Sequence, residues 1–525
     1  VLGRDLGAHL QIRRVDAQRR RAHVVDALLI VVRQCASEAL PLRVSVTATP
    51  GGDSGVARDD IRIALGTAMG ARYQRQKNGR APWTMLRGGI GVNVAPPEPE
   101  SGLTLNVNMK TLNVDQWSSI AGAIAGARGE GRAEARLDAR ADGEGADLSQ
   151  YVVPDVMAAR AGELIIGERK LDNVVVGASH GKGAWQANID SRQVSGHVTW
   201  NESPTGTGLG KVTARLASLI IPEANANDVK DLLEGNKSAA TIPALDIVSE
   251  HFELFNKQLG RLDLQANNMP AAQGREWRIN RLQLSTPDGE LKGSGKWVVR
   301  DGQSSTSMNF ALDIVDAGRL LDRLGFPETL RHGKGKMSGD IAWNGLPYAL
   351  DIPSLSGQIA MLVEQGQFLK KDPGAAKLLG VLSLQALPHL LKLDFHDVFS
   401  EGLAFDAISA NAVITRGVLK TDNLKMHGVT ATVLMDGTAD IANETTNLHV
   451  VVIPEFNLGT GSLMYLAVNP VIGVGSFLAQ LFLRAPVMRA LTYQMQIAGP
   501  WKAPLVTKLD NGKLGPVPDK STAQP

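Results

Sequence analysis

The sequence is poor in cross-linking and aromatic residues. Its 525 residues include one cysteine, Cys35, so no intramolecular disulfide can form, and only 5% of the residues are aromatic. A single cysteine neither requires nor excludes an oxidising compartment. The 43% hydrophobic content is enough for a core, and the 55 glycines favour many short strands and turns over a helical bundle.

Recognisable catalytic motifs are also missing. The sequence has no H-E-x-x-H zinc motif. The glycine-rich stretches 206–213 and 333–338 lack the spacing of a phosphate-binding loop. His389 and His396 lie near Asp394, but His389 falls on the polar side of a predicted helix. We therefore predict no catalytic residue, no metal site and no cofactor, and hence no enzyme.

The sequence also lacks a strong excess of positive or negative charge. The net charge is +2, and no long basic run persists through the body of the chain. A face that binds phosphate backbones needs clustered lysine and arginine, so we predict no nucleic-acid partner.

The chain does have apolar residues that alternate with polar ones, the pattern of half-buried β-strands. It begins near Val44, where strands start to dominate, and it is clear in residues 103–110 and 429–452. Residues 87–93, RGGIGVN, predict a further strand with tight turns, and Pro-Asp-Gly at 287–289 predicts a hairpin turn.

Short motifs recur along this pattern. SGHVTW at 195–200 returns as SGDIAW at 338–343, and residues 103–120 resemble residues 308–325. Each of the two longer stretches is an alternating strand, an Asp near a helix start and a short amphipathic helix. Repeated units of this kind predict an extended sheet in which no unit buries its apolar face alone, although chance similarity among glycine-rich strands is the alternative.

The segment 366–454 combines two periodicities. Pro373–Leu393 has helical spacing interrupted by Pro388, and the residues after Gly402 alternate with a period of two. We predict a broken amphipathic helix that covers or plugs the sheet, followed by strands.

Residues 456–483 carry no charge. The stretch is long enough to span a bilayer, but Pro470 and four glycines weaken a continuous helix. We favour an apolar helical hairpin that touches a membrane or a lipid groove, and a true span and a buried core helix stay open.

These observations predict a mainly β fold with short amphipathic helices, built on an extended sheet of repeated units, with C-terminal helices. The expected organisation is an atypical segment at 1–44, repeating β units at 45–365, a helix-and-strand region at 366–455, an apolar hairpin and last strand at 456–504, and a disordered tail at 505–525.

The stretches PGAAKLLGVLSLQALP, LDFHDVFSEGLAFDAI and ITRGVLKTDNLKM, with VVIP at 451–454, resemble the C-terminal region of the AsmA-like proteins, in particular the YhdP branch. APWTMLRGGIGVN and YQMQIAGPWKAP also match. The resemblance implies an elongated, strongly curved antiparallel sheet that forms an apolar groove. It implies a bridge-like lipid transport protein of the Gram-negative envelope, without an enzymatic step. It implies phospholipids as cargo, a periplasmic location, contact with the outer membrane and its proteins, and an inner-membrane anchor that lies in a missing N-terminal part.

Two sets of candidate residues follow from the resemblance and the alternation. The candidates for the lipid groove are Leu103, Leu105, Val107, Val429, Val433, Leu448 and Val450. The candidates for membrane contact are Leu463, Leu466, Val471, Phe477, Leu478, Leu481 and Phe482. The alternative function is a periplasmic scaffold or outer-membrane assembly factor that binds client strands at exposed sheet edges.

Overall fold

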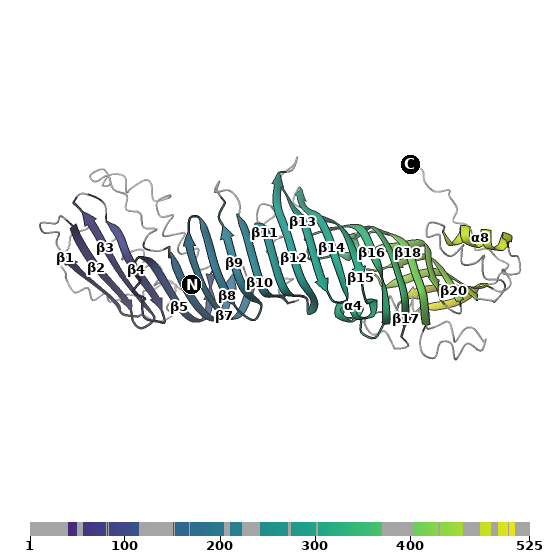
Figure 1. Cartoon of the computed structure of the whole chain (residues 1–525), viewed down its shortest axis with the longest axis horizontal. Coiled ribbons are helices and arrows are strands. Elements are labelled where there is room, and N and C mark those ends of the chain that lie inside the picture. Colours follow the sequence, from purple (N-terminus) through teal and green to yellow (C-terminus); the bar gives the residue numbers. More distant parts are fainter. Residues whose placement is uncertain are drawn as a thin grey trace, which may run out of the picture. The chain divides into compact units, whose positions relative to one another are not determined.

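A computed structural model describes most of the predicted strands and part of the predicted helices. The described residues are 40–49, 56–79, 81, 83–114, 151, 153–166, 169–203, 210–222, 242–270, 275–300, 303–369, 403–428, 431–454, 473–484, 492–501 and 503–509. The chain divides into two compact units, Val1–Leu232 (unit 1) and Leu233–Pro525 (unit 2). The mainly β fold is confirmed in both (Figure 1).

Unit 1 contains a sheet whose strands pair in chain order. Most of its pairs are antiparallel, and the alternating apolar residues of each strand bury one side of the sheet. The strands are β1 (Leu42–Thr49), β2 (Val56–Leu65), β3 (Met69–Asn78), β4 (Thr84–Val92), β5 (Gly102–Asn113), β6 (Val156–Ile166), β7 (Arg169–Gly181), β8 (Ala184–Asp190), β9 (Val194–Asn201) and β10 (Lys211–Ile221).

The predicted antiparallel sheet is confirmed, with two local exceptions in unit 1. Strand β5 runs parallel to both β4 and β6. The crossover segment, residues 93–101, therefore has to return along the sheet before β5 can start beside β4. The alternation of residue types is the same in parallel and antiparallel strands, so the sequence did not signal this change.

Glycines of β4 make room for the crossover segment, and this corrects the predicted tight turns in residues 87–93. A Cβ atom on Gly89 would lie 1.7 Å from the carbonyl oxygen of Pro97, and one on Gly91 would lie 2.3 Å from that of Val94. The two glycines belong to a continuous strand, and they let another part of the backbone lie directly on it.

Unit 2 contains an antiparallel meander in which each strand pairs with the next. Its strands are β11 (Ala244–Leu254), β12 (Lys257–Pro270), β13 (Arg275–Thr286), β14 (Gly289–Arg300), β15 (Gln303–Ile314), β16 (Leu330–Asn344), β17 (Ser356–Phe368), β18 (Leu403–Thr415), β19 (Val418–His427), β20 (Ala431–Asp440), β21 (Thr445–Pro454), β22 (Tyr493–Pro500) and β23 (Leu505–Leu509). The predicted hairpin turn at 287–289 joins β13 to β14.

Within the described residues, three short helical elements accompany the meander. Helix α4 (Ala317–Leu324) follows β15, the 3₁₀-helix η5 (Ile352–Ser354) follows β16, and α8 (Val474–Arg484) precedes β22. Asp316 caps α4 by accepting a hydrogen bond from the backbone N–H of Arg319, as the strand–Asp–helix pattern predicts.

Strand β23 corrects the start of the predicted disordered tail, because Leu505–Leu509 pairs with β22. Residues 510–525 lie outside the described residues, as do the predicted broken helix at Pro373–Leu393 and most of the segment 1–44.

Candidate functional site

The candidate site is the apolar face of each sheet. In unit 1 the pairing register joins one residue from each strand into a row across the sheet, and every residue in that row is apolar or glycine. The row is Leu42, Leu65, Met69, Val92, Val107, Ala159, Val176, Ile189, Gly196 and Leu216.

Unit 2 has an equivalent row across its meander. One polar residue, Thr421, interrupts it. The row is Ile247, Leu264, Leu282, Gly293, Phe310, Gly339, Ile359, Ala412, Thr421, Gly437, Leu448, Ile497 and Val506. Apart from Thr421, each unit therefore presents a row that is apolar or glycine over the strands it crosses.

This face of unit 2 is open in its middle strands and closed in its last ones. The open face consists of half-exposed side chains on β12–β17: Leu264, Leu282, Leu284, Leu291, Met308, Phe310, Leu312, Met337, Ile341, Ile359 and Met361. The closed face consists of buried side chains on β18–β22: Ile408, Met426, Val433, Met435, Leu448, Val450, Val452, Met495 and Ile497.

The structure brings the groove candidates of each unit onto that unit's apolar face. In unit 1, Leu103 and Val107 are buried and Leu105 is half-buried. In unit 2, Val433, Leu448 and Val450 belong to the closed face. Val429 lies outside the described residues.

Sequence reasoning missed the residues of the open face, although the MNFALDI strand at 308–314 belongs to a repeat it identified. Alternation marks one face of a strand, but it carries no signal for how much of that face stays exposed.

The membrane-contact candidates that the structure describes lie on the opposite face of unit 2. Phe477 and Leu478 of α8 are 4% and 8% exposed, and α8 contacts β19 and β20. Leu434 and Val451 also lie on this opposite face, and both are fully buried. Leu481 and Phe482 belong to α8, but their side chains are not among those described, and Leu463, Leu466 and Val471 lie outside the described residues.

A lysine is buried beside α8. The ammonium nitrogen of Lys425 lies 5.4 Å from the ring centre of Phe477, and burial lowers the pKa of this lysine. The last strands therefore carry packed side chains on both faces.

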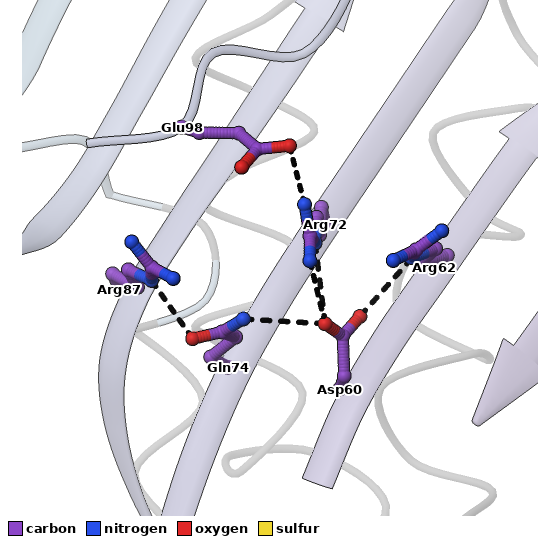
Figure 2. Close-up of polar contacts among 6 residues, drawn as sticks. All are labelled: Asp60, Arg62, Arg72, Gln74, Arg87 and Glu98. Carbon is purple, nitrogen blue, oxygen red and sulfur yellow. Dashed lines mark hydrogen bonds and ion pairs between the residues drawn. The ribbon is translucent and has the colours of Figure 1, made fainter. Parts of the chain in front are cut away.

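The polar face of unit 1 carries a charged network that holds the crossover segment (Figure 2). The Asp60 carboxylate accepts hydrogen bonds from Arg72 at 2.8 Å and from Gln74 at 3.2 Å, and Arg72 also pairs with Glu98 of the crossover segment. Burial raises the pKa of Asp60, but the bonds from Arg72, Gln74 and Arg62 outweigh it and hold that pKa below its ordinary value. The network therefore fastens the return path that makes β5 parallel to β4.

Within the described ranges, no cluster of three His, Cys, Asp or Glu side chains is arranged to hold a metal ion. None of the helices described is both long and apolar enough to cross a bilayer. His389 and His396 lie outside the described residues.

These features define a class of protein: a mainly β protein in which the sheet of each unit carries an apolar face. The chain belongs to the YhdP family, since the family model described as YhdP protein matches residues 32–506. This confirms the resemblance that the sequence motifs indicate.

Among curated proteins, the chain is similar to the intermembrane phospholipid transporter YhdP of Escherichia coli strain K12. The two are 29% identical over 256 residues, which is 49% of this chain and 20% of the relative. The match thus spans about a fifth of that protein's length. No solved structure matches the chain.

Proposed function

We propose that this chain forms a section of a conduit that carries phospholipids between the inner and outer membranes of a Gram-negative envelope. The supporting observation is the pair of cross-strand rows, which are apolar over every strand of each unit apart from Thr421. The relative's description as an intermembrane phospholipid transporter supports the same cargo.

The physical reason is the cost of exposing acyl chains to water. Each CH₂ group transferred from water to an apolar surface contributes about 0.8 kcal/mol. An apolar face that continues from strand to strand offsets this cost along the whole path. Because no bond is made or broken, the proposed transport needs no catalytic residue.

The proposal places the chain in the periplasm and gives the region around α8 the role of contacting the outer membrane. Phe477 and Leu478 are buried against the sheet in the structure, so α8 has to leave the sheet before these two side chains can enter a bilayer. Contact with the inner membrane would come from parts of a longer protein.

The test is the amount of phospholipid that the purified chain retains after incubation with vesicles of phosphatidylethanolamine and phosphatidylglycerol, measured by native mass spectrometry. Leu105→Asp places a charge on the apolar face of β5, and we expect it to reduce the bound lipid at least fivefold. Asn106→Asp, one residue along the same strand, is the matched control and should retain lipid. A wild-type chain that binds no phospholipid would contradict the proposal and favour the scaffold alternative.

A further inference from the structure

The polar face of unit 1 carries a hollow over β5, β6 and β7, which we call the unit 1 hollow. Its volume is about 440 Å³, within the range of roughly 300–1,000 Å³ that small-molecule sites occupy. The register places Asn108, Arg160 and Val175 side by side, each next to a residue of the apolar row. The side chains that line the hollow include Asn93, Asn108, Lys110, Arg160, Asn173 and Val175.

The hollow lies where the alternation of buried residues slips by one position in neighbouring strands. In β5 the buried positions pass from Val107 to Leu112, a step of five residues. Strand β6 makes the same step from Ala159 to Leu164. In β7, Asn173 stands at the level of this slip and has a φ of 55°. Bulged positions of this kind bend a strand and re-aim its side chains, so the polar face is bent under the hollow.

The unit 1 hollow is positively charged. Lys110 and Arg160 are both exposed, and none of the described residues that line the hollow is acidic. Within the described part of the chain, neither of these two side chains forms an ion pair or a hydrogen bond. Of the neighbouring carboxylates, Glu163 pairs with Lys170 at 2.8 Å, and Asp190 is separated from Arg160 by the whole of β7. The charge of the hollow is therefore available to a ligand.

Unit 2 has a hollow of comparable size over β13–β15, the unit 2 hollow, but its cations are already paired. Its volume is about 630 Å³. Arg281 lies 2.9 Å from a carboxylate oxygen of Asp263, and Lys292 lies 2.6 Å from one of Glu290. A hollow on a polar face thus forms without unpaired cations, and unit 1 is the unit that leaves two of them beside one cavity.

The two cations of the unit 1 hollow are placed to share one anionic group. Arg160 is in register with Asn108, and Lys110 follows Asn108 by two residues, so the Cα atoms of the two cations are about 8 Å apart at a strand spacing of roughly 4.8 Å and a rise of roughly 3.3 Å per residue. A guanidinium donates two parallel hydrogen bonds to a phosphate, and an ammonium adds a point charge. The carboxamides of Asn108 and Asn173 supply further donors for the remaining phosphate oxygens.

From this arrangement we infer that the unit 1 hollow binds the phosphate group of a small organic phosphate ester, either soluble or borne as the headgroup of a lipid. The volume leaves room for carbon atoms beside the phosphate, and Val175, which is 48% exposed, offers them an apolar contact. The inference goes beyond the proposed transport, because the hollow lies on the face opposite to the apolar row and needs no acyl chain.

The test is isothermal titration calorimetry of the whole chain with glycerol 3-phosphate at pH 7.5 and low salt. We expect saturable binding, and no binding of glycerol, which lacks the phosphate. Arg160→Gln should weaken the affinity at least tenfold and Lys110→Gln at least threefold. Arg281→Gln and Lys292→Gln remove the same two residue types from the unit 2 hollow, and as matched controls they should leave the affinity unchanged.

A wild-type chain that does not bind glycerol 3-phosphate would overturn the inference. Equal losses of affinity in all four variants would overturn it as well, because they would show binding by overall charge. Inorganic phosphate that binds as tightly as glycerol 3-phosphate would reject the organic ester as the ligand.

Sedimentation with phosphatidylglycerol vesicles distinguishes the two sources of the phosphate. If the phosphate is lipid-borne, Arg160→Gln lowers the sedimented fraction of the chain at least threefold, and glycerol 3-phosphate competes with the vesicles. If the ester is soluble, neither change alters the sedimented fraction. A chain that binds glycerol 3-phosphate but retains no phospholipid would keep this site and reject the conduit.

Discussion

The middle and last strands of unit 2 both contribute to the apolar face but present different surfaces. Met337 of β16 and Met435 of β20 both lie on that face. Met337 is half-exposed, whereas Met435 is 2% exposed within a cluster that includes Val450 and Met495. The open face thus has surface to offer a ligand, and the closed face is already the core of the last strands.

The comparison also explains why the last strands are apolar on consecutive residues. Residues 448–453 read LHVVVI because Val450 lies on the closed face and Val451 is buried on the opposite face, where α8 packs against β19 and β20. In the middle strands the polar face meets solvent, so charged residues such as Lys292 and Asp340 alternate with the apolar ones.

The largest expected difference in stability comes from placing a carboxylate on the closed face in one variant and on the open face in another. Val450→Asp places a carboxylate at a fully buried position, and we expect it to cost at least about 4 kcal/mol of the free energy of unfolding. Ile359→Asp lies on the open face, where water can reach the carboxylate, and should cost about 1–3 kcal/mol while it greatly reduces bound lipid. Denaturant unfolding and native mass spectrometry measure the two quantities. Similar losses of stability would mean that the two faces do not differ.

Shortening one methionine on each of the two faces should give a smaller difference in the free energy of unfolding, with the larger loss again on the closed face. Met435→Ala removes a side chain from a packed cluster and should cost about 3 kcal/mol, through lost burial and the cavity left behind. Met337→Ala removes a half-exposed side chain and should cost about 1 kcal/mol. The free energies of unfolding of the two variants, measured side by side, check this, and a larger loss for Met337→Ala would refute it.

The sequence predicted the elements of both regions well. The repeats at 195–200 and 338–343 fall in β9 and β16, and the Asp316 pattern identifies the cap of α4. These features depend on neighbours a few residues apart, which is why local periodicity finds them.

The sequence could not supply what depends on distant partners. Met337 and Met435 are the same residue type on the same face, and only the packed cluster around Met435 makes it a core residue. The parallel pairing of β5 depends on Gly89 and Gly91 meeting the crossover segment, and the same glycines fit a tight turn equally well when the sequence alone is read.

The packing of α8 gives a third and smaller test. Burial lowers the pKa of Lys425, so the docked state becomes more stable as pH rises through that lowered pKa, where the undocked state binds more protons. Lys425→Met removes the desolvation cost and should stabilise docking by about 1 kcal/mol despite the lost contact with Phe477. Hydrogen exchange of the α8 amides, followed against pH, measures both effects. Faster exchange in Lys425→Met would show that the charge holds the helix in place.

The smallest expected effect concerns His449 of β21, which lies on the face opposite to the closed face. Its Nδ1 lies 2.9 Å from a carboxylate oxygen of Asp436, and this hydrogen bond raises the pKa of the imidazole above its ordinary value of 6.5. The stabilisation is fully present below the ordinary pKa and is lost as pH rises through the raised one, and it should stay below about 1 kcal/mol. Unfolding curves from pH 5 to pH 9 should show this dependence in the wild type and not in His449→Gln.

The parallel strands of unit 1 have a consequence for how the protein is made. From β11 to β17 of unit 2 each strand pairs antiparallel with the one before it, so hairpins can add one after another as the chain leaves the ribosome. In unit 1 the hairpin pattern is interrupted at β5 and β6, because a parallel partner cannot be joined by a short turn, and residues 114–155 have to be synthesised before β6 can pair. During that interval β5 is an unpaired edge, open to pairing with other chains. The pairing of β5 with β6 should therefore be slower than the assembly of β11–β17.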